Sequence, residues 1–164
     1  VAACTKLNVP LKVVGSGRDL HSLKSIAGPT VQFLGRVDDE EVRHYLARCK
    51  ALIFPGEEDF GIVPVEAQAS GRPVVAYGAG GALETVIPGR TGEFFHEPTV
   101  DSLTAVLSGF DDSRYSPTEM NANAKQFGES VFVNKLTRFV ETARLEHAKS
   151  LNAGGVVTSR AEGR

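Results

Sequence analysis

The chain has 164 residues, 41% of them hydrophobic, and a formal net charge of −2 at pH 7. This length suits one domain with a hydrophobic core, and too few basic residues cluster for nucleic acid to be the main partner. Cys4 and Cys49 fit no metal-ligand spacing, so we expect reduced, packed thiols. No apolar run approaches the roughly 20 residues of a membrane span, and no signal peptide is visible, so a cytoplasmic location is expected.

Short apolar runs alternate with helical patterns along the chain. Residues 1–9 predict the last turns of a helix that Pro10 ends. Strands are expected at 11–14, 31–34, 51–54, 73–76 and 91–95. Helices are expected at 19–27, 38–48, 63–70, 99–109, 117–126 and 129–147, with a short one at Glu84. Asp38 and Glu41 form a capping-box pattern.

This alternation predicts an α/β fold with a Rossmann-like, doubly wound parallel sheet. The apolar run at 51–54 is typical of a strand that is covered on both faces. Residues 150–164 show no periodicity and predict a disordered tail, which leaves residues 1–149 as the domain.

Two carboxylates, Glu58 and Glu66, lie on either side of a glycine turn and a helix start, with the spacing E-x7-E. The backbone amides between them would be donors at the positive end of a helix, which suits phosphate or other polar ligand atoms. A carboxylate accepts two hydroxyl hydrogen bonds at once, so it suits the vicinal diols of ribose and sugars. These amides belong to Phe60, Gly61, Ile62 and Val63.

Both acids also have a purely structural interpretation. A carboxylate near a helix N-terminus interacts favourably with the helix dipole and stabilises the helix by about 0.3–1 kcal/mol, which would account for Glu66. Glu57, Glu58 and Asp59 would then form a solvated acidic loop. The position of this loop, at the carboxyl end of a strand in an open α/β sheet, favours a ligand site instead.

The stretch PGEEDFGIVPVEAQASGRPVVAYGAGGALETV resembles the nucleotide-sugar-binding motif of retaining GT-B glycosyltransferases, most of all bacterial mannosyltransferase-type members. The resemblance extends over residues 11–140, through VVGSGRDL, VQFLGRVDDEEV, TGEFF and NAKQFGESVF. It implies the C-terminal donor-binding domain of an enzyme that moves a hexose, mannose or glucose, from a GDP- or UDP-linked sugar to an acceptor. Such enzymes typically need no bound metal and no further cofactor, because protein cations stabilise the leaving diphosphate.

The resemblance also implies a role for each site residue. Glu58 would touch donor-sugar hydroxyls near the reacting carbon and is the candidate catalytic residue, whereas Glu66 would hold the ribose hydroxyls. The amides of residues 60–63 would contact the sugar and the distal phosphate. The residues expected against the base are Gly35, Arg36 and Val37, and those expected to border the nucleotide cleft are Gly15 and Gly17.

Two parts of the family pattern have no counterpart in this sequence. The family's diphosphate-binding Arg and Lys lie before the first residue here, and Arg18 and Lys24 occupy different positions, which indicates surface charges. The acceptor-binding N-terminal domain and the first, central strand of the C-terminal domain are also missing. These departures predict an N-terminally truncated chain, inactive alone, in which strands 11–14 and 51–54 flank a vacant strand position.

The expected partners are a nucleotide sugar, the missing N-terminal domain, and a glycan or lipid-linked acceptor that would bring the enzyme to the inner face of the membrane. A non-catalytic nucleotide-sugar-binding module and a GT-B nucleotide-sugar epimerase are the alternatives. Glu84 would either start a helix or support the sugar loop. The four histidines have no metal or triad spacing, and His96 alone follows a strand at the ligand end.

Overall fold

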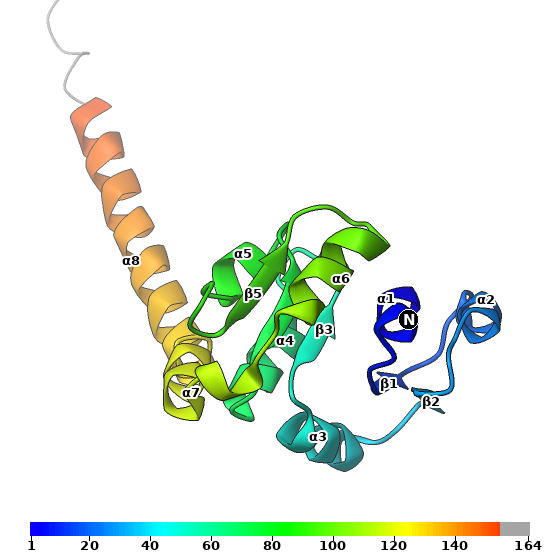
Figure 1. The fold of residues 1–164 in the computed structure, drawn as a ribbon. Helices are drawn as coiled ribbons and strands as arrows, with labels where there is room; N and C mark the ends of the chain where they lie inside the picture. Colours follow the sequence, from blue (N-terminus) through cyan, green and yellow to red (C-terminus); the bar gives the residue numbers. More distant parts are fainter. Residues whose placement is uncertain (155–164) are drawn as a thin grey trace, which may run out of the picture. The chain divides into compact units, whose positions relative to one another are not determined.

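Five short strands, all parallel to their neighbours, form the framework of the computed structural model, which describes residues 1–154 (Figure 1). They are β1 (Leu11–Val14), β2 (Val31–Gly35), β3 (Leu52–Phe54), β4 (Val74–Tyr77) and β5 (Gly92–Phe95). The α/β fold with parallel strands is thus confirmed. The strands do not form one sheet, however: β1 pairs with β2, while β3, β4 and β5 form a second sheet in that order.

The helices lie within a few residues of their expected positions. They are α1 (Ala2–Leu7), α2 (Leu20–Ser25), α3 (Asp39–Arg48), α4 (Ile62–Ala69), α5 (Ala82–Thr85), α6 (Val100–Ser108), α7 (Pro117–Lys125) and α8 (Glu129–Gly154), with a 3-10 turn η1 (Asp112–Arg114). Asp38 caps α3 as predicted, because its Oδ1 accepts a hydrogen bond from the Glu41 amide at 2.8 Å. Gly71, with φ +71°, follows the end of α4 in the left-handed conformation typical of helix stops.

Every strand except β4 has an edge without a strand partner in the described part of the chain, and β1 and β3 are the two that matter here. β1 pairs on one side only, with β2, and β3 pairs on one side only, with β4. These are the two strands that the sequence predicted to flank a vacant position. An unpaired edge exposes backbone amides and carbonyls to pairing with another strand.

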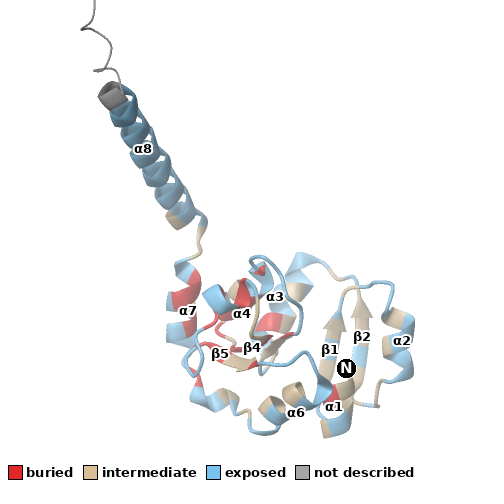
Figure 2. Ribbon diagram, turned by 90° about the horizontal axis from the view of Figure 1, so that it is seen from above, coloured by how far each residue is buried: buried red, intermediate tan, exposed pale blue. Residues whose placement is uncertain are grey.

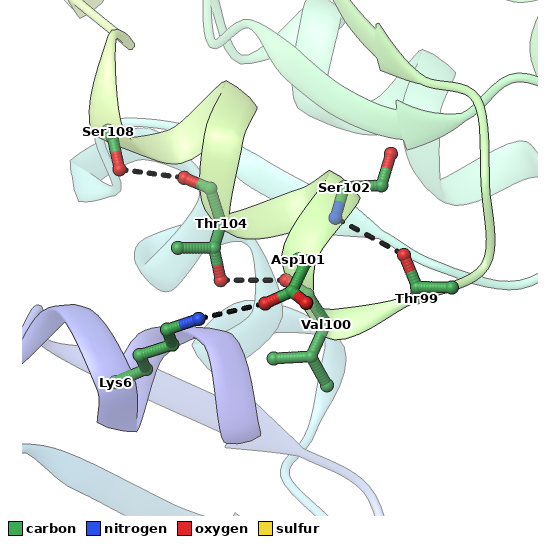
Figure 3. A network of polar contacts seen from close by, with 7 residues as sticks. All are labelled: Lys6, Thr99, Val100, Asp101, Ser102, Thr104 and Ser108. Atoms are coloured by element: carbon green, nitrogen blue, oxygen red, sulfur yellow. Dashed lines mark hydrogen bonds and ion pairs between the residues drawn. The ribbon is translucent and has the colours of Figure 1, made fainter.

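Helix α1 packs against α6, and a few polar contacts lie within and between these two helices. Lys6 Nζ and Asp101 Oδ1 form an ion pair at 2.8 Å, and Thr99 caps α6 by accepting a hydrogen bond from the Ser102 amide (Figure 3). The Lys6 ammonium lowers the pKa of Asp101 through its hydrogen bond and its charge. Both side chains are mostly exposed, so the pair adds little to stability.

The main hydrophobic core is built around the three-stranded sheet (Figure 2). Val74, Val75 and Ala76 of β4 are fully buried, as expected for a central strand that is covered on both faces. The core cluster comprises Leu46, Phe54, Ala67, Val74, Ala76, Ala82 and Val86. It therefore lies directly beneath the loop that carries Glu58 and beneath α4.

The chain divides into two compact units, residues 1–125 and 126–164, while the expected domain of residues 1–149 stays a prediction. The physical reason is that α8 keeps large apolar side chains exposed, Phe139 by 72% for example. The predicted tail of residues 150–164 starts too early, because α8 continues through residues 150–154, which contain no proline; residues 155–164 lie outside the described part. No helix within residues 1–154 has the length and apolarity to cross a membrane.

Tyr115 gives the folded unit a dependence on alkaline pH. Its buried hydroxyl donates a hydrogen bond to Glu93 Oε1 at 2.8 Å, and its ring stacks on Phe110. Burial, and then the hydrogen bond to Glu93, raise the pKa of Tyr115 above its usual value. The folded state therefore favours the protonated phenol, so this stabilisation is complete below the unfolded pKa of about 10 and is lost as pH rises above it.

We expect Tyr115→Phe to lower the free energy of unfolding by about 1 kcal/mol at pH 8, because one hydrogen bond is lost. The variant should also lose less stability than the wild type between pH 10 and 12, since the shifted phenol is gone. Urea unfolding at several pH values measures both effects. Tyr77→Phe is the matched hydroxyl deletion and should keep the wild-type alkaline loss. An equal alkaline loss in Tyr115→Phe and wild type would contradict this assignment.

Candidate functional site

The start of α4 is set by Gly61 and by the ring beneath it. Gly61 is the N-cap residue and has φ +72°, a conformation that disfavours other residues. A Cβ at this position would also lie 3.0 Å from Cζ of the buried Phe54 ring. No side chain caps α4, and Pro64 in its first turn has no N–H to satisfy. The helix therefore begins with backbone amides that no capping side chain occupies, at the positive end of the helix dipole.

Glu58 and Glu66 are both exposed at this helix start, and neither forms an ion pair within residues 1–154. Glu58 lies in the loop after β3, whereas Glu66 lies in the second turn of α4 and not the first. Because the helix dipole acts mainly within the first turn, the structure weakens the purely structural interpretation of Glu66. Both carboxylates are free to accept hydroxyl groups of a ligand.

The exposed side chains of Phe60, Ile62 and Val63 surround the helix start. Their side chains are 42%, 61% and 38% exposed. An exposed apolar rim beside uncapped amides is compatible with a sugar, whose ring faces are apolar and whose edges are polar. The structure thus brings together all the site residues that were predicted between 58 and 66.

The second group of predicted site residues lies at the ends of β1 and β2. The Gly15 amide donates a hydrogen bond to the Gly35 carbonyl at 2.6 Å, which joins the segment predicted to border the nucleotide cleft to the segment predicted to face the base. Gly17 and Arg36 are exposed and Val37 is half-buried. This group therefore stands on the two-stranded sheet, while the Glu58–Glu66 group stands on the three-stranded sheet.

The remaining charged and histidine candidates lie at the surface or next to a single element. Arg18 is 94% exposed beside Asp19, and Lys24 is an exposed residue above the Phe33 ring, so both are surface charges as predicted. Glu84 lies in the first turn of α5, as a helix-start carboxylate would. His96 follows β5 and lies against Gly78. No group of three or more His, Cys, Asp or Glu side chains within residues 1–154 is arranged to hold a metal ion.

Sequence reasoning missed the residues that support the Glu58 loop from behind. Gly80 and Gly81 lie directly against the backbone of Glu58 and Phe60, and the Gly81 amide donates to the Glu58 carbonyl at 2.7 Å. The signal was present, since GAGG is unusually rich in glycine, but it indicated only a turn before a short helix. Gln68 and Asn123, which are hydrogen-bonded to each other in the core, gave no signal at all.

Parallel strands that lead into a carboxylate-bearing loop and an uncapped helix start define an α/β ligand-binding domain. Residues 2–127 match the family model described as "Glycosyl transferases group 1". The chain belongs to this family of glycosyltransferases, which confirms the resemblance carried by the central stretch.

Two curated relatives illustrate the sequence similarity. The chain is 36% identical over 97 residues to an alpha-1,3/1,6-mannosyltransferase of Dictyostelium discoideum, covering 58% of this chain and 23% of that protein. It is 34% identical over 131 residues to a GDP-mannose-dependent monoacylated alpha-(1-6)-phosphatidylinositol monomannoside mannosyltransferase of Corynebacterium glutamicum, covering 73% and 34%. The matched part of the chain thus spans 23% of the length of the first relative and 34% of the second.

Solved structures confirm the fold. A sucrose-phosphate synthase from Thermosynechococcus elongatus matches with a TM-score of 0.65 at 21% identity, over 86% of this chain and 49% of that chain. An Anabaena protein in complex with UDP-glucose matches with a TM-score of 0.65 at 24% identity, over 86% and 43%. The fold is the GT-B type of parallel α/β domain that the sequence predicted.

Proposed function

We propose that this chain is the donor-binding part of a retaining glycosyltransferase that transfers mannose or glucose from a GDP- or UDP-linked sugar. The observation that carries the proposal is the start of α4, which has no side-chain cap and is flanked in the chain by two exposed carboxylates, in a chain of the group 1 family. The names of the relatives support the donor class. One is GDP-mannose-dependent, and the Anabaena structure holds UDP-glucose.

Each group then has a role that follows from its chemistry. Glu66 accepts the ribose hydroxyls, and Glu58 accepts sugar hydroxyls beside the reacting carbon, because a carboxylate can take two hydroxyl donors. The amides of residues 60–63 donate to the sugar and the distal phosphate, with the positive end of α4 behind them. Gly35, Arg36 and Val37 face the base, and Gly15 and Gly17 border the nucleotide.

The acceptor and the cations that stabilise the leaving diphosphate belong to the rest of the enzyme in this proposal. The charge that develops on the diphosphate needs fixed cations near it, and Arg18 and Lys24 are exposed surface charges that occupy other positions in the sequence pattern than the family's diphosphate-binding Arg and Lys. We therefore expect the 164-residue chain alone to transfer no sugar. A glycan or a lipid-linked acceptor, reached in the cytoplasm or at the inner face of a membrane, completes the proposal.

Glu66→Ala in the full-length gene product should raise the donor KM about 10- to 100-fold and leave kcat nearly unchanged. The lost hydrogen bonds to a charged acceptor are worth about 1.5–3 kcal/mol, and they are made in both the ground and transition states. Initial rates with GDP-mannose and with UDP-glucose measure this. Glu146→Ala, which removes an exposed helical glutamate from α8, is the control. An unchanged donor KM in Glu66→Ala would contradict the assignment.

Product analysis of the same reactions distinguishes the proposed transferase from the two alternatives, a binding module and an epimerase. Sugar transferred to an acceptor with retained anomeric configuration supports the proposed function. Donor that binds but gives no product with any acceptor tested would indicate a nucleotide-sugar-binding module instead. A changed nucleotide sugar in the absence of acceptor would indicate an epimerase.

A further inference from the structure

The loop that carries Glu58 has little core packing of its own. Every residue from Pro55 to Phe60 is exposed. Its backbone is instead in contact with a pair of glycines, Gly80 and Gly81, in the loop that follows β4. A Cβ on Gly80 would overlap the Glu58 carbonyl oxygen, and a Cβ on Gly81 would overlap the Phe60 backbone. The Gly81 amide also donates a hydrogen bond to the Glu58 carbonyl at 2.7 Å.

The glycine pair is itself held by a buried polar network. Thr85, on the short helix that follows, donates a hydrogen bond from Oγ1 to the Gly81 carbonyl at 3.1 Å. The Thr85 carbonyl accepts two further hydrogen bonds, from Gln68 Nε2 at 2.8 Å and from Asn123 Nδ2 at 2.9 Å. Asn123 Nδ2 also donates to Gln68 Oε1 at 2.6 Å. Gln68 and Thr85 are fully buried, and Asn123 is 7% exposed.

This network connects three elements to the loop. Gln68 belongs to α4, two residues after Glu66, while Asn123 belongs to α7. Buried polar groups whose hydrogen bonds are all made favour one arrangement of the elements that carry them. Gly81 therefore cannot move relative to α4 without breaking buried hydrogen bonds, and the loop cannot move toward Gly81 without steric overlap.

We propose that Gly80, Gly81 and Thr85 form a template that positions the Glu58 carboxylate relative to the amides at the start of α4, with Gln68 and Asn123 bracing it. These are positioning residues, since none of them is assigned a contact with the donor. The inference rests on the proposed function, because a positioned carboxylate matters only if a sugar is transferred. It adds to that function a set of residues that determine turnover from outside the binding site.

Gly81→Ala should lower kcat about 100-fold, the effect of displacing a reacting group by about 1 Å. The donor KM should rise less than kcat falls, because the ribose contact of Glu66 does not depend on the loop, whereas the displaced Phe60 backbone carries one of the amides assigned to the sugar and distal phosphate. Gly109→Ala is the matched control, since Gly109 has open space around it and no positive φ. The kinetics are measured on the full-length gene product, with circular dichroism of both variants.

A second pair of variants tests the template without adding bulk. Thr85→Val keeps the side-chain shape but deletes the hydroxyl that donates to the Gly81 carbonyl beside the Glu84 and Thr85 amides, whereas Thr85→Ser keeps the hydroxyl. Thr85→Val should lower kcat about fivefold, the equivalent of one lost hydrogen bond, and Thr85→Ser should retain wild-type kcat. A Thr85→Val kcat equal to that of Thr85→Ser would overturn the proposal, even if Gly81→Ala fails to fold.

The outcomes separate this inference from the proposed function. If the wild-type enzyme transfers sugar and Gly81→Ala has the wild-type kcat, the template is wrong while the function stands. If all Gly81→Ala losses appear as less folded protein with unchanged kcat per folded molecule, the glycines are merely structural and the template is again wrong. If the wild-type enzyme transfers no sugar from either donor, the proposed function is contradicted, and the inference that rests on it is contradicted as well.

Discussion

Glu58→Ala in the full-length gene product is expected to lower kcat about 10²–10³-fold and to change the donor KM much less. In the proposed function this carboxylate accepts hydrogen bonds from the sugar beside the reacting carbon, where positive charge develops as the bond to the diphosphate breaks. A group that stabilises the transition state more than the ground state affects kcat rather than KM. Loss of one preorganised electrostatic partner typically has this magnitude.

Two further variants show whether charge, position or both matter at Glu58. Glu58→Gln keeps the size and one acceptor oxygen but removes the charge, so we expect it to recover little activity. Asp59→Asn removes the neighbouring charge from the same exposed loop and should have less than a threefold effect, since exposed charges are strongly screened. Equal losses in Asp59→Asn and Glu58→Gln would show that the loop acts only through its total negative charge.

The elements around this site could be predicted because their signals are local. Gly61, Pro64 and Gly71 mark the beginning and end of α4 by conformational restriction, and the structure places the helix between them. Asp38 and Glu41 likewise marked the start of α3. Parallel pairing followed from the alternation of strands and helices, so the juxtaposition of the carboxylates with a helix start could be deduced before any coordinates.

The parts that could not be predicted depend on contacts between residues far apart in the chain. Asn123 and Gln68 are 55 residues apart, and neither residue type signals a buried role, because amides are mostly exposed in proteins. The contact of Gly81 with Phe60 depends on how closely two loops approach, which no periodicity encodes. The end of α8 was missed because residues 150–154 lack an apolar pattern, although nothing in them breaks a helix before the glycines.

The long-range contacts have a consequence for the candidate site, because α7 packs against α4, the helix whose start carries the site. The two helices pack together, and the Asn123–Gln68 hydrogen bond lies between them. The positions of the amides at the start of α4 and of the Glu66 carboxylate therefore depend on the position of α4 as a whole. Stability of the α4–α7 contact should accordingly limit the temperature range over which donor binds.

Met120→Ala is expected to lower the free energy of unfolding of residues 1–125 by about 2–5 kcal/mol. Met120 is a large, fully buried side chain of α7, 1% exposed, and its truncation both loses buried apolar surface and leaves a cavity. Urea unfolding of the 164-residue chain, followed by far-UV circular dichroism, measures the loss. Leu83→Ala is the control: its side chain is 57% exposed, so it should cost less than about 1 kcal/mol.

The donor titration separates this loss of stability from a loss of function. Below its unfolding transition, full-length Met120→Ala should bind donor with the wild-type KM, because Met120 is a core residue of α7 and is not among the residues assigned a ligand contact. Above a temperature that the destabilisation lowers, binding and helical signal should disappear together. A Met120→Ala protein as stable as Leu83→Ala would show that α7 does not support α4, and a weakened donor affinity at full helicity would show that α7 shapes the site directly.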